Sequence, residues 1–298
     1  MQSRYLSLIC LAILPLFAPA ELFGISRGFV KEGLTLSSEI LGKEVRYSIY
    51  LPYDYEDSNR RYPAVYLLHG YTDSDFGWIQ YGEAHLIADR AIANREIPPM
   101  ILILPDGGDS WYIDNYDGSV PYGTFLTEEF IPEMESRYRI RSEKRFRGIA
   151  GLSMGGYGAL IHTLKHPELF AACAALSPAV YTKDEIVSFT KERWKRTESV
   201  VYGPGLAGEK RLTEHLRNHN PLHLVREEQH PDLSGTRFYI DCGDDDFLYK
   251  GNSTLHILFR DKGVHHEYRV RDGEHRWSYW RSGLLEGLRF IGKSFHLP

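Results

Sequence analysis

The sequence predicts an α/β protein built on a doubly wound, mostly parallel sheet. Continuous apolar runs at 64–68 and 100–104, and a short strand-like segment at 146–150, are followed by loops that contain glycine. Such runs are typical of strands that are buried on both faces of a parallel sheet. Segments of helical composition alternate with them, at 82–95 and at 122–138. Residue types that carry catalysis follow several strand ends, which is where ligands bind in this fold class.

The other elements continue this alternation along the chain. An antiparallel pair of strands at 29–41 and 45–51 is expected first, with its turn at Gly42 and Lys43. A helix begins at Gly156, after the 146–150 strand. The later elements are a strand at 171–176, a strand at 238–241, a helix at 255–262, a strand at 266–270 and a helix at 278–290.

Residues 181–232 interrupt the alternation. They are rich in Lys, Glu, His and Asn, and they hold helical pieces but no apolar strand. We therefore interpret them as an insertion over the carboxyl edge of the sheet and not as a second domain. One domain is expected to span residues 21–298, with this insertion inside it.

The first twenty residues have the composition of a cleavable signal peptide. Arg4 provides a positive start, residues 6–17 are almost continuously apolar, and Ala18-Pro19-Ala20 offers small residues for cleavage. The apolar run is too short for a stable membrane anchor. We expect a secreted or periplasmic protein that is cleaved after Ala20.

Composition limits the remaining possibilities. A chain of 298 residues with 43% hydrophobic and 25% charged residues is typical of one large α/β domain. The formal net charge is -5, so nucleic acid is not expected as a partner.

Cys173 and Cys242 lie in apolar strand-like runs, and neighbouring parallel strands rarely place two Cβ atoms suitably for a disulfide. We expect both to be buried free thiols.

Ser153 is the predicted nucleophile. It is the centre of Gly151-Leu152-Ser153-Met154-Gly155, between a buried strand and a helix. A serine hydroxyl needs a base before it can attack, and a strained strand-to-helix turn presents it to one. Glycines two positions to either side permit that turn, because they have no Cβ to collide.

Two late strand ends offer the base and the acid that a serine nucleophile needs. His275 follows the last strand, and Asp244, Asp245 and Asp246 follow the strand before it. The order Ser, Asp, His fits this arrangement. The residues alone do not choose among the three acids. These acids could also form a solvated turn or part of a cation site, but no further oxygen-ligand spacing accompanies them, so no metal is predicted.

An oxyanion hole completes the expected site. Two backbone N–H groups must stabilise the charge that develops on the former carbonyl oxygen. Met154, which follows the nucleophile, provides one of them. The second is expected from the loop after the 64–68 strand, which is His69-Gly70-Tyr71.

Several motifs together resemble the esterase D, feruloyl esterase and antigen 85 group of α/β-hydrolases, over residues 35–295. They are Leu67–Gly70 with Trp78, Ile149–Gly156, His166–Phe170, Cys242-Gly243 with Asp246, and Gly273–Trp277 with Trp280. The resemblance implies an α/β-hydrolase fold. It selects Asp246 as the acid, because the acid stands three residues after the glycine of the Cys-Gly motif. It also selects His275, which precedes a tryptophan, and it assigns the second oxyanion N–H to Tyr71.

Trp78, Trp277 and Trp280 lie near the predicted catalytic loops. We expect them to bind substrate, because an aromatic wall suits a feruloyl ring or a sugar face. With 20 Tyr and 14 Phe in the chain, packing in the core explains such aromatic residues equally well.

These observations predict an exported serine carboxylesterase that acts through an acyl-enzyme and needs no cofactor. Its expected substrates are short acyl or hydroxycinnamoyl esters, such as acetyl or feruloyl esters of carbohydrate. An acyltransferase of the antigen 85 type remains an alternative, since it would use the same catalytic residues. A non-catalytic carbohydrate-binding protein on a hydrolase scaffold is a second alternative.

Overall fold

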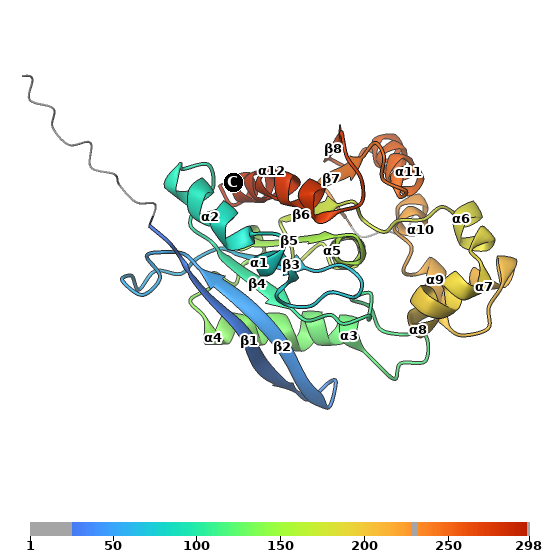
Figure 1. Cartoon of the computed structure of the whole chain (residues 1–298), viewed down its shortest axis with the longest axis horizontal. Coiled ribbons are helices and arrows are strands. Elements are labelled where there is room, and N and C mark those ends of the chain that lie inside the picture. Colours follow the sequence, from blue (N-terminus) through green and yellow to red (C-terminus); the bar gives the residue numbers. More distant parts are fainter. Residues whose placement is uncertain (1–25, 228–231, 297–298) are drawn as a thin grey trace, which may run out of the picture.

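The computed structural model describes residues 26–227 and 232–296 and contains one eight-stranded sheet (Figure 1). The strand order is β1-β2-β4-β3-β5-β6-β7-β8. β1 pairs with β2, and β2 with β4, in antiparallel fashion, whereas all later pairs are parallel. The prediction of an α/β fold with a mostly parallel sheet is confirmed. The expected signal peptide lies outside the described residues.

The central strands are buried on both faces, as their continuous apolar runs predict. Every residue of β3, β4, β5 and β6 is buried, and these strands form the middle of the sheet. The strands are β1 (Phe29–Ser38), β2 (Lys43–Leu51), β3 (Ala64–Leu68), β4 (Ile101–Pro105), β5 (Arg147–Leu152), β6 (Ala172–Leu176), β7 (Arg237–Gly243) and β8 (His266–Arg271).

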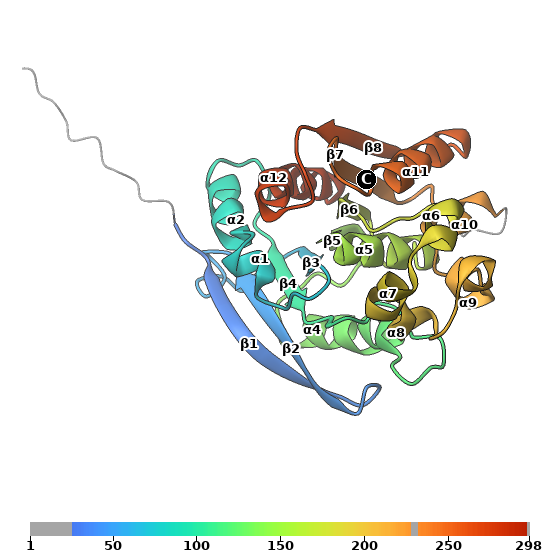
Figure 2. The same ribbon diagram turned by 45° about the vertical axis from the view of Figure 1, so that its right-hand side comes forward.

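Helices cover both faces of the sheet. α1, α2 and α12 pack on one face, and α3, α4, α5 and α11 pack on the other (Figures 1 and 2). Their bounds are α1 (Gly77–Gln80), α2 (Ala84–Ala93), α3 (Tyr122–Thr124), α4 (Ile131–Arg137), α5 (Met154–Lys165), α11 (Tyr249–Asp261) and α12 (Trp277–Ser294).

The helix expected at 122–138 is interrupted. A π-helical stretch, Phe125–Phe130, joins α3 to α4, and Pro132 stands at the beginning of α4. Proline has no N–H and its ring collides with the carbonyl group four residues earlier in a regular α-helix. A wider turn before Pro132 removes that collision, which explains the irregularity.

The insertion forms a cluster of short helices at one end of the molecule, beside α5 (Figures 1 and 2). α10 packs against both α5 and α11. The cluster is therefore attached to α5, the helix that follows Ser153 directly. Its pieces are α6 (Lys183–Ser188), α7 (Lys191–Arg193), a π-helix (Trp194–Glu198), α8 (Ser199–Tyr202), a 3₁₀-helix (Gly208–Arg211), α9 (Glu214–Arg217) and α10 (Pro221–Arg226).

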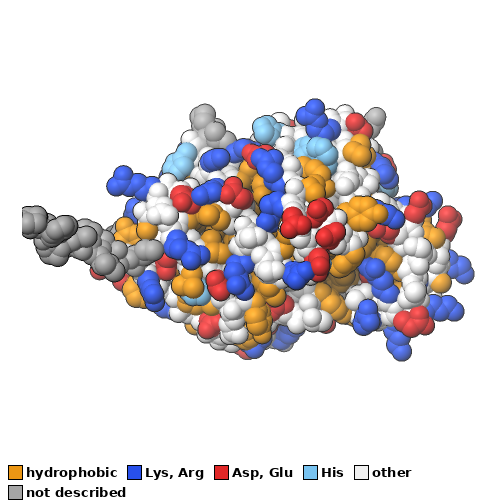
Figure 3. Space-filling model, turned by 45° about the horizontal axis from the view of Figure 1, so that its top comes forward, with side chains coloured by type: hydrophobic (Ala, Val, Ile, Leu, Met, Phe, Trp, Pro, Cys, Tyr) orange, Lys and Arg blue, Asp and Glu red, His pale blue; other side chains and the backbone are white. Residues whose placement is uncertain are grey.

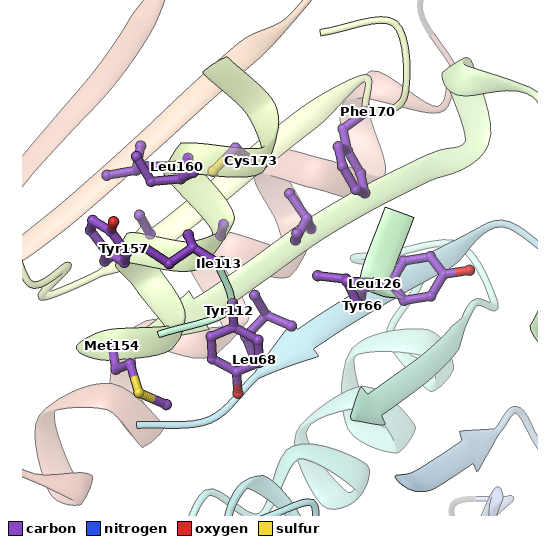
Figure 4. Packing of buried hydrophobic residues seen from close by; sticks show 14 of the residues in the cluster. Tyr66, Leu68, Tyr112, Ile113, Leu126, Met154, Tyr157, Leu160, Phe170 and Cys173 are labelled. Carbon is purple, nitrogen blue, oxygen red and sulfur yellow. The ribbon is translucent and has the colours of Figure 1, made fainter. Parts of the chain in front are cut away.

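The core layer on the α5 side reaches the catalytic loops. Leu68, Tyr112 and Met154 belong to this layer, close to the beginning of α5 (Figure 4). Cys173 and Cys242 are buried and unpaired, as expected from their strand positions. Burial raises the pKa of the Cys173 thiol to about 12. These thiols are therefore neutral core groups.

Charged groups of both signs cover the surface seen in Figure 3, with apolar side chains between them. Neither sign dominates this face. Within the described residues, no helix is long and apolar enough to cross a lipid bilayer.

Candidate active site

Ser153 occupies a strained turn between β5 and α5. Its backbone angles are φ 52° and ψ -116°, a combination that L-residues rarely adopt. A Cβ on Gly151 would lie 2.4 Å from the carbonyl carbon of Gly155, and a Cβ on Gly155 would lie 2.4 Å from the Leu68 carbonyl oxygen. Both positions therefore require glycine. The turn leaves the Ser153 side chain partly exposed at the carboxyl edge of the sheet.

Ser153, His275 and Asp246 form a continuous chain of hydrogen bonds. The Ser153 Oγ lies 2.9 Å from Nε2 of His275, and Nδ1 of His275 lies 2.8 Å from Oδ2 of Asp246. Asp246 is 1% exposed. Burial alone would raise the pKa of Asp246, but the hydrogen bond and charge of His275 and the Leu248 N–H outweigh it and lower the pKa below its usual value. The carboxylate is thus ionised and orients the imidazole.

Two aromatic rings enclose the His275 imidazole. The Phe247 ring lies 4.6 Å from it and the Trp280 ring lies 4.8 Å from it, in an edge-on arrangement. Phe247 is 56% exposed although it follows the buried Asp246. The sequence shows an aromatic residue directly after a predicted catalytic acid, but only the structure shows that its ring lies against His275.

The three consecutive aspartates have different environments. Asp244 and Asp245 are both exposed. Asp244 also accepts a hydrogen bond from the Gly273 N–H over 2.9 Å. Asp244 therefore connects the loop after β7 to the loop that carries His275. Only Asp246 points inward to the imidazole.

The loop after β3 presents the backbone groups expected for an oxyanion hole. A Cβ on Gly70 would lie 3.7 Å from the Ser153 Cβ, so this loop runs next to the nucleophile. In the described part of the chain, the N–H groups of Tyr71 and Met154 donate no hydrogen bond to a protein acceptor. Both groups remain available to an oxygen atom beside Ser153.

His69 holds the orientation of the Gly70–Tyr71 peptide. The Gly107 N–H donates to Nε2 of His69 over 2.8 Å, so this nitrogen is an acceptor and the proton lies on Nδ1. Nδ1 in turn donates to the Gly70 carbonyl oxygen over 2.8 Å. Because the N–H and C=O groups of a trans peptide point in opposite directions, this bond turns the Tyr71 N–H away from His69. This function of His69 was not predicted from the sequence, where His69 is only one residue of the loop after a buried strand.

A cavity of about 380 Å³ opens above Ser153. Trp277 and Trp280 line it together with Phe247 and Trp111, in agreement with the expected aromatic wall. The expectation that Trp78 binds substrate does not hold. Its side chain is fully buried, donates through Nε1 to the Leu68 carbonyl oxygen and lies 5.2 Å from the Trp277 ring. Trp78 thus packs behind Trp277, which lines the cavity.

The insertion supplies another part of the cavity lining. The residues that line it there are Tyr181, Arg193, Arg196, Thr197 and Glu198. The polar composition of the insertion indicated a surface over the carboxyl edge but did not indicate which side chains face the serine.

Within the described residues, the carboxylates that lie close enough together to share a cation are Asp244, Asp245 and Asp272. All three are exposed, and Asp244 already accepts the Gly273 N–H. Among the described residues, no hydrogen bond joins these three carboxylates to the side chains of Ser153, His275 or Asp246.

A serine at the turn after a central parallel strand, with His and Asp on the loops after the last two strands, defines a serine hydrolase of the α/β-hydrolase class. Residues 38–291 match the putative esterase family, and the chain belongs to that family.

Individual relatives agree with this membership. An acetyl esterase of Caldicellulosiruptor saccharolyticus is 27% identical over 264 residues, which cover 86% of this chain and 96% of that protein. An endo-1,4-beta-xylanase/feruloyl esterase of Xylanibacter ruminicola is 34% identical over 174 residues, covering 54% of this chain and 23% of that protein. The solved structure of a ferulic acid esterase superposes with a TM-score of 0.77 at 29% identity, covering 90% of this chain and 99% of that one.

Proposed function

We propose that the protein is a serine carboxylesterase that hydrolyses short acyl or hydroxycinnamoyl esters of carbohydrate through an acyl-enzyme. The observation that carries this proposal is the hydrogen-bonded chain from Ser153 through His275 to Asp246 at the base of an aromatic-lined cavity. The similarity to an acetyl esterase and to a ferulic acid esterase supports the two acyl classes.

The proposed reaction has two halves. Nε2 of His275 accepts the Ser153 proton while Oγ forms a bond to the ester carbonyl carbon, and the N–H groups of Tyr71 and Met154 stabilise the oxyanion. The imidazolium then gives its proton to the alkoxy oxygen, and the alcohol leaves. A water molecule that loses its proton to His275 attacks the acyl-enzyme, and the free acid departs as Ser153 regains its proton.

The size and walls of the cavity support compact acyl groups. A volume of about 380 Å³ suits a small ligand and offers rings for stacking. A panel of acetyl, butyryl, feruloyl and palmitoyl esters tests this point, and a preference for palmitoyl would contradict it. Acyl transfer would use the same residues, so product partition between water and an added sugar alcohol separates hydrolysis from transfer.

The test of the mechanism is Ser153→Ala, assayed with 4-nitrophenyl acetate. We expect turnover to fall on the order of 10⁴-fold or more while the melting temperature is maintained. A fluorophosphonate should label the wild-type protein and not the variant. Activity within roughly tenfold of wild type would exclude Ser153 as the nucleophile, and a wild-type protein that takes no label would favour a non-catalytic binding function.

The composition of residues 1–20 supports export as part of the same proposal. N-terminal sequencing of the protein recovered from an expressing cell tests it. A chain that begins at Glu21 is the expected result, and a chain that retains residues 1–20 would contradict it.

A further inference from the structure

A buried carboxylate on the insertion faces the catalytic cavity. Glu198 lines the same cavity as Ser153 and His275, yet it is only 3% exposed. The proposed reaction does not use this residue. A charged group that is kept out of water must have partners that compensate for its lost hydration.

The backbone fixes the position of Glu198. It ends the π-helix Trp194–Glu198, whose wide turns leave carbonyl groups free for other donors. The Tyr71 hydroxyl donates to the Arg196 carbonyl oxygen over 2.7 Å, and Trp111 Nε1 donates to the Thr197 carbonyl oxygen over 3.1 Å. The segment is therefore attached both to the oxyanion loop and to the aromatic wall.

The side-chain partners of Glu198 satisfy part of its acceptor capacity. Nε and Nη2 of Arg193 each lie 3.3 Å from Oε1, and the Thr197 hydroxyl donates to Oε2. A carboxylate offers about four acceptor positions, and donors from other described residues occupy three of them, so one position on Oε2 takes no hydrogen bond from another described residue. Burial raises the pKa of Glu198, and Thr197, Arg193 and the backbone N–H of Glu198 itself partly oppose that rise.

Arg193 is itself held in place. Its guanidinium lies 3.6 Å from the centre of the Phe189 ring and 4.7 Å from that of Tyr181. Arg193 neutralises the charge of Glu198. The remaining acceptor position on Oε2 therefore suits a neutral donor better than a cation. A hydroxyl group is the neutral donor that both sugars and hydroxycinnamoyl groups carry.

We propose that Glu198 accepts a hydrogen bond from a substrate hydroxyl and thereby selects hydroxyl-bearing esters over esters that lack one. This inference rests on the proposed esterase function and adds a specificity-determining residue to it. The hydroxyl belongs either to the acyl group, as the phenol of a feruloyl ester, or to the sugar. In both cases the chemistry at Glu198 is the same.

Matched substrate pairs test the proposal. Methyl ferulate and methyl 3,4-dimethoxycinnamate differ only in the phenolic hydroxyl, and methyl 2-O-acetyl-β-xyloside and its 3,4-di-O-methyl ether differ only in sugar hydroxyls. In the wild-type protein, kcat/KM should favour the hydroxyl-bearing member of one pair by about tenfold or more, since a site built to bind a hydroxyl rejects the analogue that lacks it. The pair that shows the preference identifies the source of the hydroxyl.

The variant Glu198→Gln should remove most of this preference. Both Arg193 nitrogens donate to Oε1, so the introduced amide keeps its oxygen there. Its NH₂ group then takes the place of Oε2 and offers a donor where an acceptor is needed. The ratio of kcat/KM within the pair should fall on the order of tenfold. Glu192→Gln, an exposed residue on the same segment, is the matched control and should change neither the ratio nor the activity.

The outcomes separate the two proposals. An equal ratio in wild type and Glu198→Gln would show that the preference comes from the size of the methyl group and would overturn the inference. A wild-type protein that hydrolyses 4-nitrophenyl acetate in a Ser153-dependent way, but shows no preference in either pair, would overturn the inference alone. Absence of all ester hydrolysis would overturn the proposed function. If Glu198→Gln fails to fold, Glu198→Asp, which withdraws the carboxylate, should show the same fall, and an unchanged ratio would again overturn the inference.

Discussion

The replacement Asp246→Asn tests the geometry of the site most directly. In the wild-type protein, Oδ1 of Asp246 accepts the Leu248 N–H over 2.9 Å, while Oδ2 accepts from Nδ1 of His275 over 2.8 Å. The introduced amide has only one oxygen. The backbone N–H of Leu248 can only donate, so it selects that oxygen, and the NH₂ group is left facing His275.

This orientation places the imidazole in the wrong tautomer. Nδ1 of His275 would have to accept from the NH₂ group, and its proton would move to Nε2, where it faces the Ser153 hydroxyl and blocks proton transfer. Rotating the amide would leave the Leu248 N–H unsatisfied, which costs about 1–3 kcal/mol. The loss of the negative charge also destabilises the imidazolium. Together these effects should lower kcat/KM on the order of 10⁴-fold, or about 5.4 kcal/mol.

The assay is hydrolysis of 4-nitrophenyl acetate at neutral pH, with circular dichroism to verify the fold. Asp245→Asn is the matched control, because Asp245 is exposed, and it should change kcat/KM less than about twofold. Asp244→Asn retains an oxygen for the Gly273 N–H and should have a small effect. A crippled Asp245→Asn variant, or an Asp246→Asn variant within tenfold of wild type, would refute the reasoning.

Three further changes probe the surroundings of the triad. His69→Phe removes the bond that orients the Gly70–Tyr71 peptide, so kcat for 4-nitrophenyl acetate should fall on the order of tenfold to a hundredfold with a smaller change in KM; an unchanged kcat would contradict this role. Phe247→Ala removes one of the rings against His275 and should lower kcat/KM by about two- to tenfold, whereas equal activity would show that Trp280 alone holds the imidazole. Burial lowers the pKa of His162 to about 3, against an opposing hydrogen bond to the Tyr112 carbonyl. Below about pH 6.5 His162 therefore binds a proton in the unfolded chain but not in the native state. The free energy of unfolding should fall by about 2 kcal/mol from pH 7.5 to pH 5 because of this residue. Urea unfolding of His162→Gln should show a correspondingly smaller pH dependence, and an identical dependence would exclude His162 as the cause.

The alternation of apolar runs and helical segments was sufficient to predict the fold, because the central strands are buried on both faces. The turn at Ser153 was equally predictable, since Gly151 and Gly155 occupy positions where no Cβ fits. In both cases a short stretch of sequence contains the residue types that the folded structure requires at that place: apolar residues in a buried strand, and glycine where a Cβ would collide.

Other features depend on contacts between distant segments and were not predictable. Trp78 lies next to the catalytic loops in sequence, but the Leu68 carbonyl and the Trp277 ring draw its side chain into the core. Glu198 reaches the cavity only because a π-helix of the insertion is attached to Tyr71. Neither contact leaves a periodic pattern in the chain.

The backbone of Ser153 limits how stable this protein can become. A residue held at φ 52° and ψ -116° costs about 1–3 kcal/mol, and three hydrogen bonds, with the Leu176 carbonyl and the Tyr157 and Ala179 N–H groups, keep it there. Relaxing the turn would favour the folded state but would withdraw the hydroxyl from His275. Folding and catalysis therefore make opposite demands on one residue. A more heat-resistant homologue that keeps its activity must gain its stability elsewhere, in the outer helices or the antiparallel edge of the sheet.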